Sequence, residues 1–262
     1  MSTAHLCCSP DNLDTTAVWY RLVYFNVRGV VEPVRLLLAL SGARWEDIRY
    51  PMGVASAGFS VDERFTSDKA DGNFSCNMDR LPVLHIVTST QGGPGEALAV
   101  ETIGQSHAIA RFLARRHGLM GSSELEGARV DAIVECVRDI KTEWQKVKRT
   151  EDAAARTEAK KEWFASTFPA FCSRLERCLP GGDATSWCVG SEPSLADVCV
   201  YHLLSTPVAL VSGATVSFFD GEAQRVRDAF ETTCPRLHAC VLATGNLPPI
   251  RDWEQQRPDT FS

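Results

Sequence analysis

The residues best placed to do chemistry lie in the segment 20–42, where the pattern of the sequence changes. Apolar and polar residues alternate over 21–25 as in a β-strand, and a helical period begins near Val30. Tyr24 therefore ends a predicted strand and faces the start of a predicted helix, where free backbone N–H groups favour an anion. The Tyr24 hydroxyl adds one more hydrogen-bond donor, so this junction suits a negatively charged group.

A tyrosine hydroxyl in this position could activate a bound thiol. A cysteine thiol has an ordinary pKa of about 8.5, so only a few per cent is ionised at neutral pH. Lowering that pKa by about two units requires roughly 2.7 kcal/mol of preference for the anion. One hydrogen bond to a charged group contributes about 1.5 to 3 kcal/mol, and a protonated tyrosine can donate it. The alternative interpretation is a tyrosine that packs on the core with its hydroxyl in water.

The elements that must position Tyr24 are predicted in the order strand, helix, strand, loop, strand, strand, helix. The second strand is predicted at 45–50, and the third begins at Leu81. A short strand around 97–100 and a helix from Ser106 to about residue 118 complete this half of the chain. The segment 51–80 between the second and third strands has little apolar periodicity. It predicts a long connection without regular structure, of a kind that is usually functional or mobile.

From about residue 120 the sequence predicts helices only. An apolar stripe with spacings of three and four runs over 130–147, and a second one runs over 164–178. Ser194 and Asp197 have the spacing of a capping box ahead of an apolar run, which indicates the start of a helix and not a catalytic role. The chain is therefore predicted to divide into an α/β half and an all-helical half.

Taken together, these motifs resemble the cytosolic glutathione transferases. The similarity is greatest to the sigma class, which includes the haematopoietic prostaglandin D synthases. It extends over roughly 19–258 and rests on three ordered motifs, YRLVYFNVRGVVEP at 20–33, LPVL at 81–84 and QSHAIARFLARRHGL at 105–119.

The resemblance implies a fold of the class α/β plus all-α. A flexible tail at 1–17 would precede a thioredoxin-like, glutathione-binding domain at 18–119 with the element order βαβ–ββα. An all-helical domain would follow at 120–262.

The resemblance also implies glutathione as substrate or cofactor and Tyr24 as the catalytic residue that stabilises its thiolate. The remaining site residues that it implies all bind glutathione: Phe65, Lys69, Arg80, Leu81, Pro82, Gln105, Ser106 and Asp139.

Each of these positions has an expected role. The start of the helix at Gln105 and Ser106 suits the γ-glutamyl carboxylate, because backbone N–H groups and a hydroxyl converge there. Leu81, before a cis bond to Pro82, would pair its backbone with the cysteinyl part of glutathione. Arg80 matches a Lys or Gln contact in the relatives.

The other three roles are less local. Phe65 and Lys69 reproduce the spacing of a Trp-x-x-x-Lys pair that binds the glycyl end, within a longer loop. Asp139 takes the place of an aspartate that reaches the glutathione of the other subunit across a dimer interface. A Lys in a polar loop and an Asp on a helix surface are alternatively just solvated.

Besides Phe65, which replaces the Trp of the Trp-x-x-x-Lys pair, two positions depart from the family pattern. The second arginine of the motif YFN-x-RGRAE is Val30 here, and Arg28 lies two positions earlier. We therefore expect weaker activation of the thiol than in the relatives. Prostaglandin D synthases bind a divalent ion through a carboxylate at the position before Asp139, which is Arg138 here, so no metal site is expected.

The function that follows is a homodimeric glutathione transferase that conjugates or reduces a hydrophobic electrophile. The electrophile would bind between the two halves, with Trp144 and Trp253 as candidates for its apolar lining. The alternatives are a glutathione-dependent isomerase of the prostaglandin D synthase type and a non-catalytic, transferase-like binding or structural protein.

Composition limits the partners and the compartment. The net charge of −6 provides no attraction to nucleic acid or anionic membranes, and no apolar stretch of membrane-spanning length occurs. The 10 cysteines form no C-x-x-C pair, and apolar neighbours around Cys136, Cys172 and Cys199 indicate buried, reduced thiols. The N-terminal residues lack the features of a secretory signal, so a reducing, cytoplasmic location is expected.

Overall fold

The structure is a computed structural model. It describes residues 16–55, 58–90, 98–179, 186–205, 208–209, 215–216, 219, 222–258 and 260. Of the predicted N-terminal tail at 1–17, only Thr16 and Ala17 lie within the described residues, and they open the first strand.

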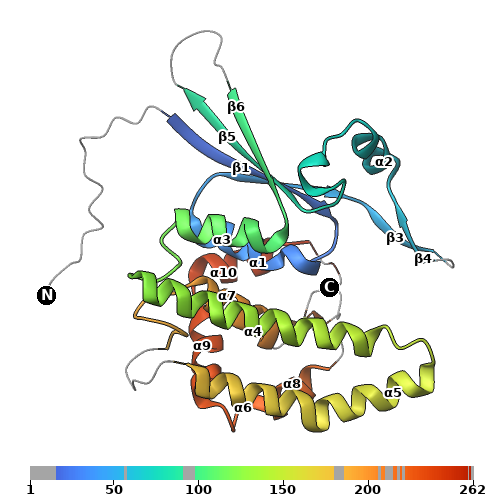
Figure 1. Ribbon diagram of the computed structural model, residues 1–262, viewed down its shortest axis with the longest axis vertical. Coiled ribbons are helices and arrows are strands. Elements are labelled where there is room, and N and C mark those ends of the chain that lie inside the picture. The colour runs from blue at the N-terminus through green and yellow to red at the C-terminus, as the bar shows by residue number, and fades with distance from the viewer. Residues whose placement is uncertain are drawn as a thin grey trace, which may run out of the picture.

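The first half is built on a four-stranded sheet with the order β2-β1-β5-β6. The strands are β1 (Thr16–Phe25), β2 (Trp45–Tyr50), β5 (Val83–Thr90) and β6 (Leu98–Gly104). β1 runs parallel to β2 and antiparallel to β5, and β6 is antiparallel to β5. Helices α1 (Glu32–Ser41) and α3 (Ser106–Arg116) lie between this sheet and the helical half (Figure 1). The predicted thioredoxin-like order is thereby confirmed.

β1 has one face toward each of two cores. Tyr20 and Leu22 are buried in the large core that includes α1 and α3, whereas Val23 is buried in a smaller cluster with Tyr50 and Phe74. Side chains alternate between the faces of a strand. Tyr24 therefore points to the same side as Tyr20 and Leu22, toward the helices.

The connection at 51–80 has more regular structure than the sequence predicts. It contains the hairpin strands β3 (Met52–Ala55) and β4 (Gly58–Val61), the helix α2 (Glu63–Ala70) and the 3-10 turn η2 (Ser75–Asn77). The expectation of a structureless loop is wrong. These elements are short and α2 has no fully buried residue, so none of them produces an apolar period that could be recognised.

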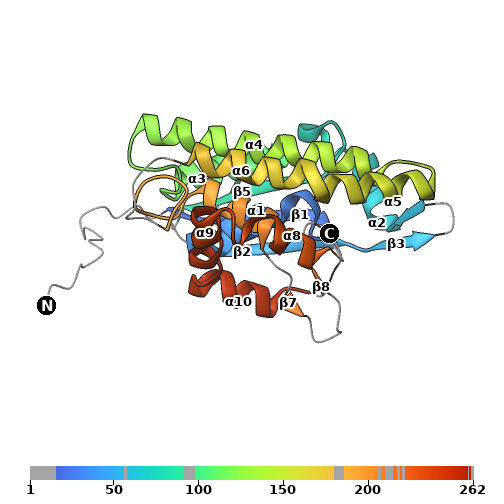
Figure 2. The same cartoon turned by 90° about the horizontal axis from the view of Figure 1, so that it is seen from below.

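The second half is mainly helical, as predicted. Its longest helix, α4 (Glu124–Lys148), contacts both α6 and α7, and Figure 2 shows α4 and α6 running side by side. The other elements are α5 (Ala153–Glu162), the π turn η3 (Trp163–Thr167), α6 (Phe168–Cys178), α7 (Leu195–Leu204), α8 (Ala223–Phe230), α9 (Pro235–Gly245) and α10 (Pro248–Gln256). A small ladder of β7 (Val208–Ala209) with β8 (Thr215–Val216) adds to the helices that the sequence predicts.

Helix α7 is the centre of the helical half, since all its residues are buried. It begins with the predicted capping box, in which Asp197 accepts hydrogen bonds from the backbone and the hydroxyl of Ser194. α7 packs against α1, α4 and α9, and α10 also contacts α1. The two halves therefore share one core around α1 and α7, and a site between them rests on buried helices.

Candidate functional site

Three of the predicted segments meet at one end of the sheet. In the ladder, Val83 lies opposite both Val23 and Gly104. The residues one step further along the three strands are Tyr24, Pro82 and Gln105. Strand register alone therefore brings the predicted catalytic tyrosine beside two of the segments predicted to bind glutathione.

Tyr24 lies directly under the turn that leads into α1. A Cβ atom on Gly29 would lie 3.0 Å from the Tyr24 hydroxyl oxygen and 3.1 Å from its ring carbon Cε1. Gly29 also has a φ of +46°, which side chains other than glycine rarely adopt. Glycine at this position is what allows the backbone to pass so close to the hydroxyl.

The surroundings of Tyr24 keep its hydroxyl protonated. Burial raises the pKa of Tyr24 above its ordinary value, while a backbone hydrogen bond from Val30 and the charge of Arg35 lower it to a smaller extent. At neutral pH the phenol is therefore a hydrogen-bond donor, as stabilisation of a thiolate requires.

The family motif places an arginine next to the catalytic tyrosine, and the two positions considered for such a cation here are Val30 and Arg28. Val30 is 57% exposed, and it lines the cavity described below. The Arg28 side chain is buried, and its Nε donates to the carbonyl oxygen of Thr260 at 3.0 Å. Arg28 thus connects this turn to the C-terminal segment.

A buried arginine holds the turn before α1. Arg35 donates to the carbonyl oxygen of Val27 at 2.8 Å and pairs with Asp47 at 3.1 Å and with Glu32 at 3.3 Å. The backbone that passes over Tyr24 is therefore fixed by a charged side chain in the core.

Glu32 extends this network to the C-terminal helix. Its carboxylate accepts from Trp253 Nε1 at 3.0 Å and from Arg257 at 2.7 Å, both from the end of the chain. Burial raises the pKa of Glu32, but the charges of Arg257 and Arg35 outweigh that effect and lower it overall. Trp253 is thus engaged by Glu32 and by Trp45 and is not a lining residue of the cavity, contrary to expectation.

Asn77 organises the other side of the site. Its Nδ2 donates to the carbonyl oxygens of Arg80 at 3.0 Å and Pro82 at 2.8 Å, and its Oδ1 accepts from Gln105 Nε2 at 2.8 Å. The bond between Leu81 and Pro82 is cis, as the family resemblance implies. One buried amide therefore connects the segment before β5 to the start of α3.

Sequence reasoning missed Asn77 because it lies in the polar connection, where an asparagine gives no distinguishing signal. The need for glycine at residue 104 is visible only in the structure, because a Cβ atom there would lie 2.4 Å from Asn77 Cβ. Gln105 has a φ of +69°, and Ser106 begins α3, so its first-turn N–H groups lie at this end of the sheet.

The remaining predicted residues lie further from this cluster. Phe65 is half-buried, with its ring centre 4.9 Å from that of Phe25 and 5.6 Å from that of Phe74. Lys69 is exposed in the last turn of α2, and its side chain makes no hydrogen bond or ion pair with the described part of the chain. Asp139 is exposed on α4. Their roles toward glutathione stay predictions.

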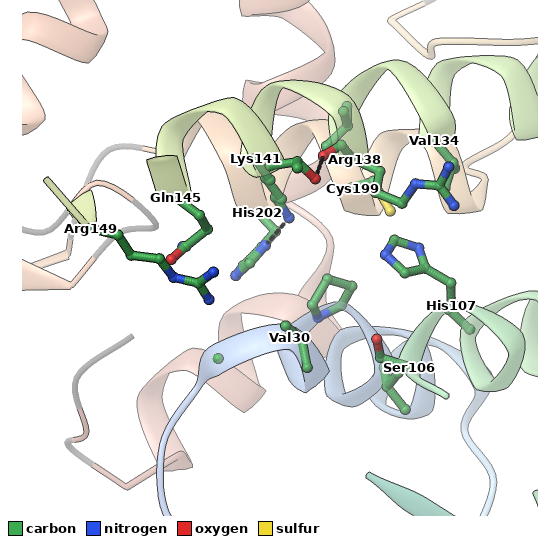
Figure 3. A pocket seen from close by; sticks show the side chains of 16 residues that line it. Val30, Ser106, His107, Val134, Arg138, Lys141, Gln145, Arg149, Cys199 and His202 are labelled. Atoms are coloured by element: carbon green, nitrogen blue, oxygen red, sulfur yellow. Dashed lines mark hydrogen bonds between the residues drawn. The ribbon is translucent and has the colours of Figure 1, made fainter. Parts of the chain in front are cut away.

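A cavity of about 350 Å³ lies between the two halves (Figure 3). One of its walls comes from the turn at Gly29 and Val30 together with α1 and α3, and the other comes from α4, the following Arg149 and α7. Its apolar lining consists of Val30, Pro33, Val34, Ala110, Val134 and Val137 together with Gly29. Its polar lining consists of Ser106, His107, Arg138, Lys141, Thr142, Gln145, Arg149, Cys199 and His202.

Trp144, the other tryptophan expected to line this space, belongs to the core. It is buried, and its ring centre lies within 5.6 Å of those of Trp163, Phe164 and Phe219. The expectation is wrong because α4 is covered on more than one side, and an apolar stripe does not tell which side faces a cavity.

Lys141 and His202 are functional candidates that sequence reasoning missed. Lys141 Nζ lies 2.8 Å from His202 Nδ1. Burial lowers the pKa of Lys141 to about 8, and burial followed by the charge of Lys141 lowers that of His202 well below its ordinary range. At pH 7 a charged ammonium therefore donates to a neutral imidazole. The available signal was the spacing of Val134, Val137 and Lys141, which places a charge on an otherwise apolar helical face.

Among the described residues, one group of side chains has the composition to hold a metal ion. One ligand atom each of Cys188, Asp197 and Cys240 lie within 4.8 Å of one another, and all three residues are buried. Both oxygens of Asp197 already accept hydrogen bonds, from the backbone of Cys188 and from Ser194. This group therefore fits the structural role of the capping box.

The described cysteines are all free thiols. Cys172 and Cys199 are buried as expected, but Cys136 is exposed. Cys136 directly precedes the buried Val137 on α4, but adjacent residues of a helix point in different directions. Apolar neighbours in the sequence therefore did not indicate that Cys136 itself is buried.

Comparison with known proteins identifies the family. A family model described as "Glutathione S-transferase, C-terminal domain" matches residues 138–257. The "Glutathione S-transferase class-mu 28 kDa isozyme" of Schistosoma japonicum is 30% identical over 226 residues, covering 83% of this chain and 94% of the relative. The chain therefore belongs to the glutathione S-transferase family, as its motifs predict.

Other relatives support the sigma-type likeness. "S-crystallin SL11" of Nototodarus sloanii is 28% identical over 72% of this chain and 80% of its own length. "Hematopoietic prostaglandin D synthase" of Gallus gallus is 28% identical over 92% of this chain and 98% of its own. A solved structure, "Fasciola hepatica sigma class GST", has the same fold, with a TM-score of 0.62 and 21% identity over 93% of this chain and 99% of that one. No helix in the described part of the chain is long and apolar enough to cross a membrane.

Proposed function

We propose that the protein conjugates glutathione to small electrophiles, with Tyr24 stabilising the glutathione thiolate. The observation that carries the proposal is the position of the Tyr24 hydroxyl, which lies under the turn at Gly29 that borders the cavity. Glutathione would lie along the sheet end formed by Leu81, Pro82, Gln105 and Ser106, and the electrophile would occupy the cavity.

The reaction is a nucleophilic substitution or addition at carbon. With an aryl chloride, the glutathione sulfur forms a bond to the ring carbon, the carbon–chlorine bond breaks and chloride leaves. The thiol proton passes to solvent before attack. Tyr24 remains protonated throughout and donates to the sulfur, so its contribution is stabilisation of the thiolate and its orientation.

The test compares wild type with Tyr24→Phe, using 1-chloro-2,4-dinitrobenzene as electrophile. We expect turnover to fall by about 10- to 1000-fold while glutathione affinity, measured by calorimetry, stays within about twofold. Titration of the bound thiol by its thiolate absorbance should show a higher pKa in the variant. Tyr20→Phe is the matched control, because Tyr20 lies on the same face of β1 and its hydroxyl bonds to His117 at 3.0 Å. Equal turnover in wild type and Tyr24→Phe would refute the role of Tyr24.

We further propose that the protein acts as a cytoplasmic homodimer in detoxification, with Asp139 of one subunit reaching the glutathione of its partner. The exposure of Asp139 on α4 is compatible with this role. Sedimentation equilibrium measures the oligomeric state directly, and a monomer at all concentrations would exclude a role for Asp139 across an interface.

Two other functions have support from the relatives. The likeness to prostaglandin D synthase favours a glutathione-dependent isomerase, which product analysis with a prostaglandin endoperoxide would detect. The likeness to S-crystallin and the loss of the motif arginine at Val30 favour a non-catalytic protein. That alternative gains if wild type binds glutathione but turns over neither an aryl halide nor a peroxide.

A further inference from the structure

The charge of the cavity lining is strongly one-sided. Arg138 and Lys141 on α4 and Arg149, which directly follows that helix, supply three cationic side chains, and none of the sixteen described lining residues is an aspartate or glutamate. Two imidazoles also line the cavity, His202 on α7 beside the α4 cations and His107 on α3 across from them. A cavity with this lining attracts anions.

The wall at the start of α1 is apolar. Val30 faces the polar groups of α4 and α7 across the cavity in Figure 3, and the lining residues Pro33 and Val34 of α1 belong to the same wall. Val137 adds an apolar group on the α4 side. Val30 matters most, because the family motif has an arginine there and the apolar wall would otherwise carry its own charge. The volume of about 350 Å³ suits a compact molecule with an apolar body.

Lys141 is the cation best placed to receive an anionic group. Its ammonium is held at 2.8 Å from His202 Nδ1, on the part of α4 that faces the cavity. The low dielectric around it strengthens attraction to an opposite charge. Arg138 differs, since it is half-exposed and pairs with Glu135 through an ion pair of 2.5 Å. The Arg149 guanidinium also extends toward the cavity in Figure 3.

The electrostatic field at neighbouring groups agrees with a net positive cavity. Burial lowers the pKa of His107, and the charges of Lys141, Arg111 and Arg138 lower it further, against a single opposing carboxylate, Glu135.

We propose, resting on the proposed transferase function, that the cavity selects electrophiles that combine an apolar body with a carboxylate, and that Lys141 binds this carboxylate. His202 is a positioning residue that orients the ammonium. Carboxylates with an aryl halide or an unsaturated carbonyl group are the substrate class that meets this description.

Protonation of Lys141 makes the preference pH-dependent. The charged and titratable groups that line the cavity with it are Arg138 on its own helix, Arg149 just after that helix, His202 and Cys199 on α7, and His107 on α3, while the lining residues of α1 carry no charge. The histidines are neutral at pH 7, so Lys141 is the group that titrates as the pH rises through about 8. Carboxylate binding should therefore weaken above that pH.

The test measures binding of an unreactive matched pair, 3,5-dinitrobenzoate and its methyl ester, by calorimetry at saturating glutathione. On wild type at pH 6.5 we expect the carboxylate to bind at least about tenfold tighter than the ester. Lys141→Met, which keeps the side-chain length, should bring the two affinities within about twofold of each other. Lys141→Arg should keep the preference and remove its decline near pH 8. Lys146→Met is the control, since Lys146 is exposed on the same helix.

Several results would overturn the inference. Equal affinity of acid and ester on wild type, or equal loss of both in Lys141→Met, would show that the carboxylate is not read by Lys141. A fall in glutathione affinity, or a raised pKa of the bound thiol in Lys141→Met, would assign the lysine to glutathione instead.

Turnover of 4-chloro-3,5-dinitrobenzoate separates this inference from the proposed function. Binding that depends on Lys141 without any turnover would refute the transferase proposal and leave the anion site in place. Turnover of neutral electrophiles without a preference for carboxylates would support the transferase proposal and refute the anion site at Lys141.

Discussion

The substitution Asn77→Asp tests whether one buried amide holds the proposed glutathione site together. It preserves the shape of the side chain but replaces the Nδ2 donor by an oxygen. That oxygen would face the carbonyl oxygens of Arg80 and Pro82, to which Asn77 Nδ2 now donates at 3.0 Å and 2.8 Å. The bond from Gln105 to Oδ1 at 2.8 Å would be kept.

The expected cost follows from these contacts. Two donated hydrogen bonds are lost, each contributing about 0.5 to 1.5 kcal/mol. A carboxylate that is 3% exposed and faces two carbonyl oxygens adds a desolvation and repulsion penalty of at least about 1 kcal/mol. The free energy of unfolding should fall by about 3 kcal/mol, which leaves a folded protein if its total is in the usual range of about 5 to 15 kcal/mol.

Two measurements check this prediction. Urea unfolding, followed by tryptophan fluorescence and circular dichroism, should show the loss of stability. Glutathione titration should show about tenfold weaker binding, because the segment of the cis peptide at Leu81 is less firmly held. Asn73→Asp is the matched control. Asn73 is an exposed asparagine in the same connection whose Nδ2 bonds, among the described residues, only to Asp68, at 3.0 Å. Water screens the repulsion between the new carboxylate and Asp68, so this replacement should cost less than about 1 kcal/mol.

The pH dependence of the stability of the Asn77→Asp variant provides a further test. A carboxyl group buried against carbonyl oxygens has a raised pKa in the folded state, so the folded variant binds a proton more readily than the unfolded chain. The deficit relative to wild type should therefore be smaller at pH 5 than at pH 8. A variant with wild-type stability and glutathione affinity, or with a deficit independent of pH, would refute the role given to Asn77.

Two other substitutions have equally definite outcomes. Gly29→Ala should lower turnover by at least about tenfold, because the new methyl group presses on the Tyr24 hydroxyl at 3.0 Å. Gly42→Ala, which shares the positive φ but has open space around it, should cost only about 1 kcal/mol of stability and leave the rate unchanged; equal rates for both variants would contradict this account. Glu32→Gln should destabilise the protein by about 3 kcal/mol at pH 7, because it removes the fully buried one of the two carboxylates that pair with each of the buried Arg35 and Arg257. The pKa of Glu32 is lowered by folding, so its stabilisation is present above about pH 4.5 and is lost as the pH falls; urea unfolding from pH 7 to pH 3 should show a flatter pH dependence in the variant, and parallel curves would contradict it.

The family and the main elements could be predicted because they depend on local patterns. Alternation over β1, the helical period after Val30 and the capping box at Ser194 are each encoded within a few residues and are present in the structure. Tyr24 could be singled out because the change of period occurs next to it. The short elements between residues 51 and 80 could not be predicted, because none is long enough to show a period.

The pairing of distant residues was decided only by the tertiary structure. Asn77 acts on Pro82 and Gln105 through side-chain bonds that no local pattern encodes. Whether a residue of an apolar helical face meets the core or a cavity depends on what packs against it. For that reason Trp144 lies in the core, whereas Lys141, on the same helix, lines the cavity.

The sequence by itself thus determined the glutathione S-transferase family, the order of strands and helices and the identity of the candidate tyrosine. These depend on local period, capping and turn residues, which each segment carries within itself. The tertiary structure decided which side chains surround the cavity and which charges it presents. These depend on how helices pack against one another, and α1 and α7 are more than a hundred residues apart in the chain. The cationic wall of α4 opposite Val30 is such a feature, and the substrate class proposed for this protein follows from it.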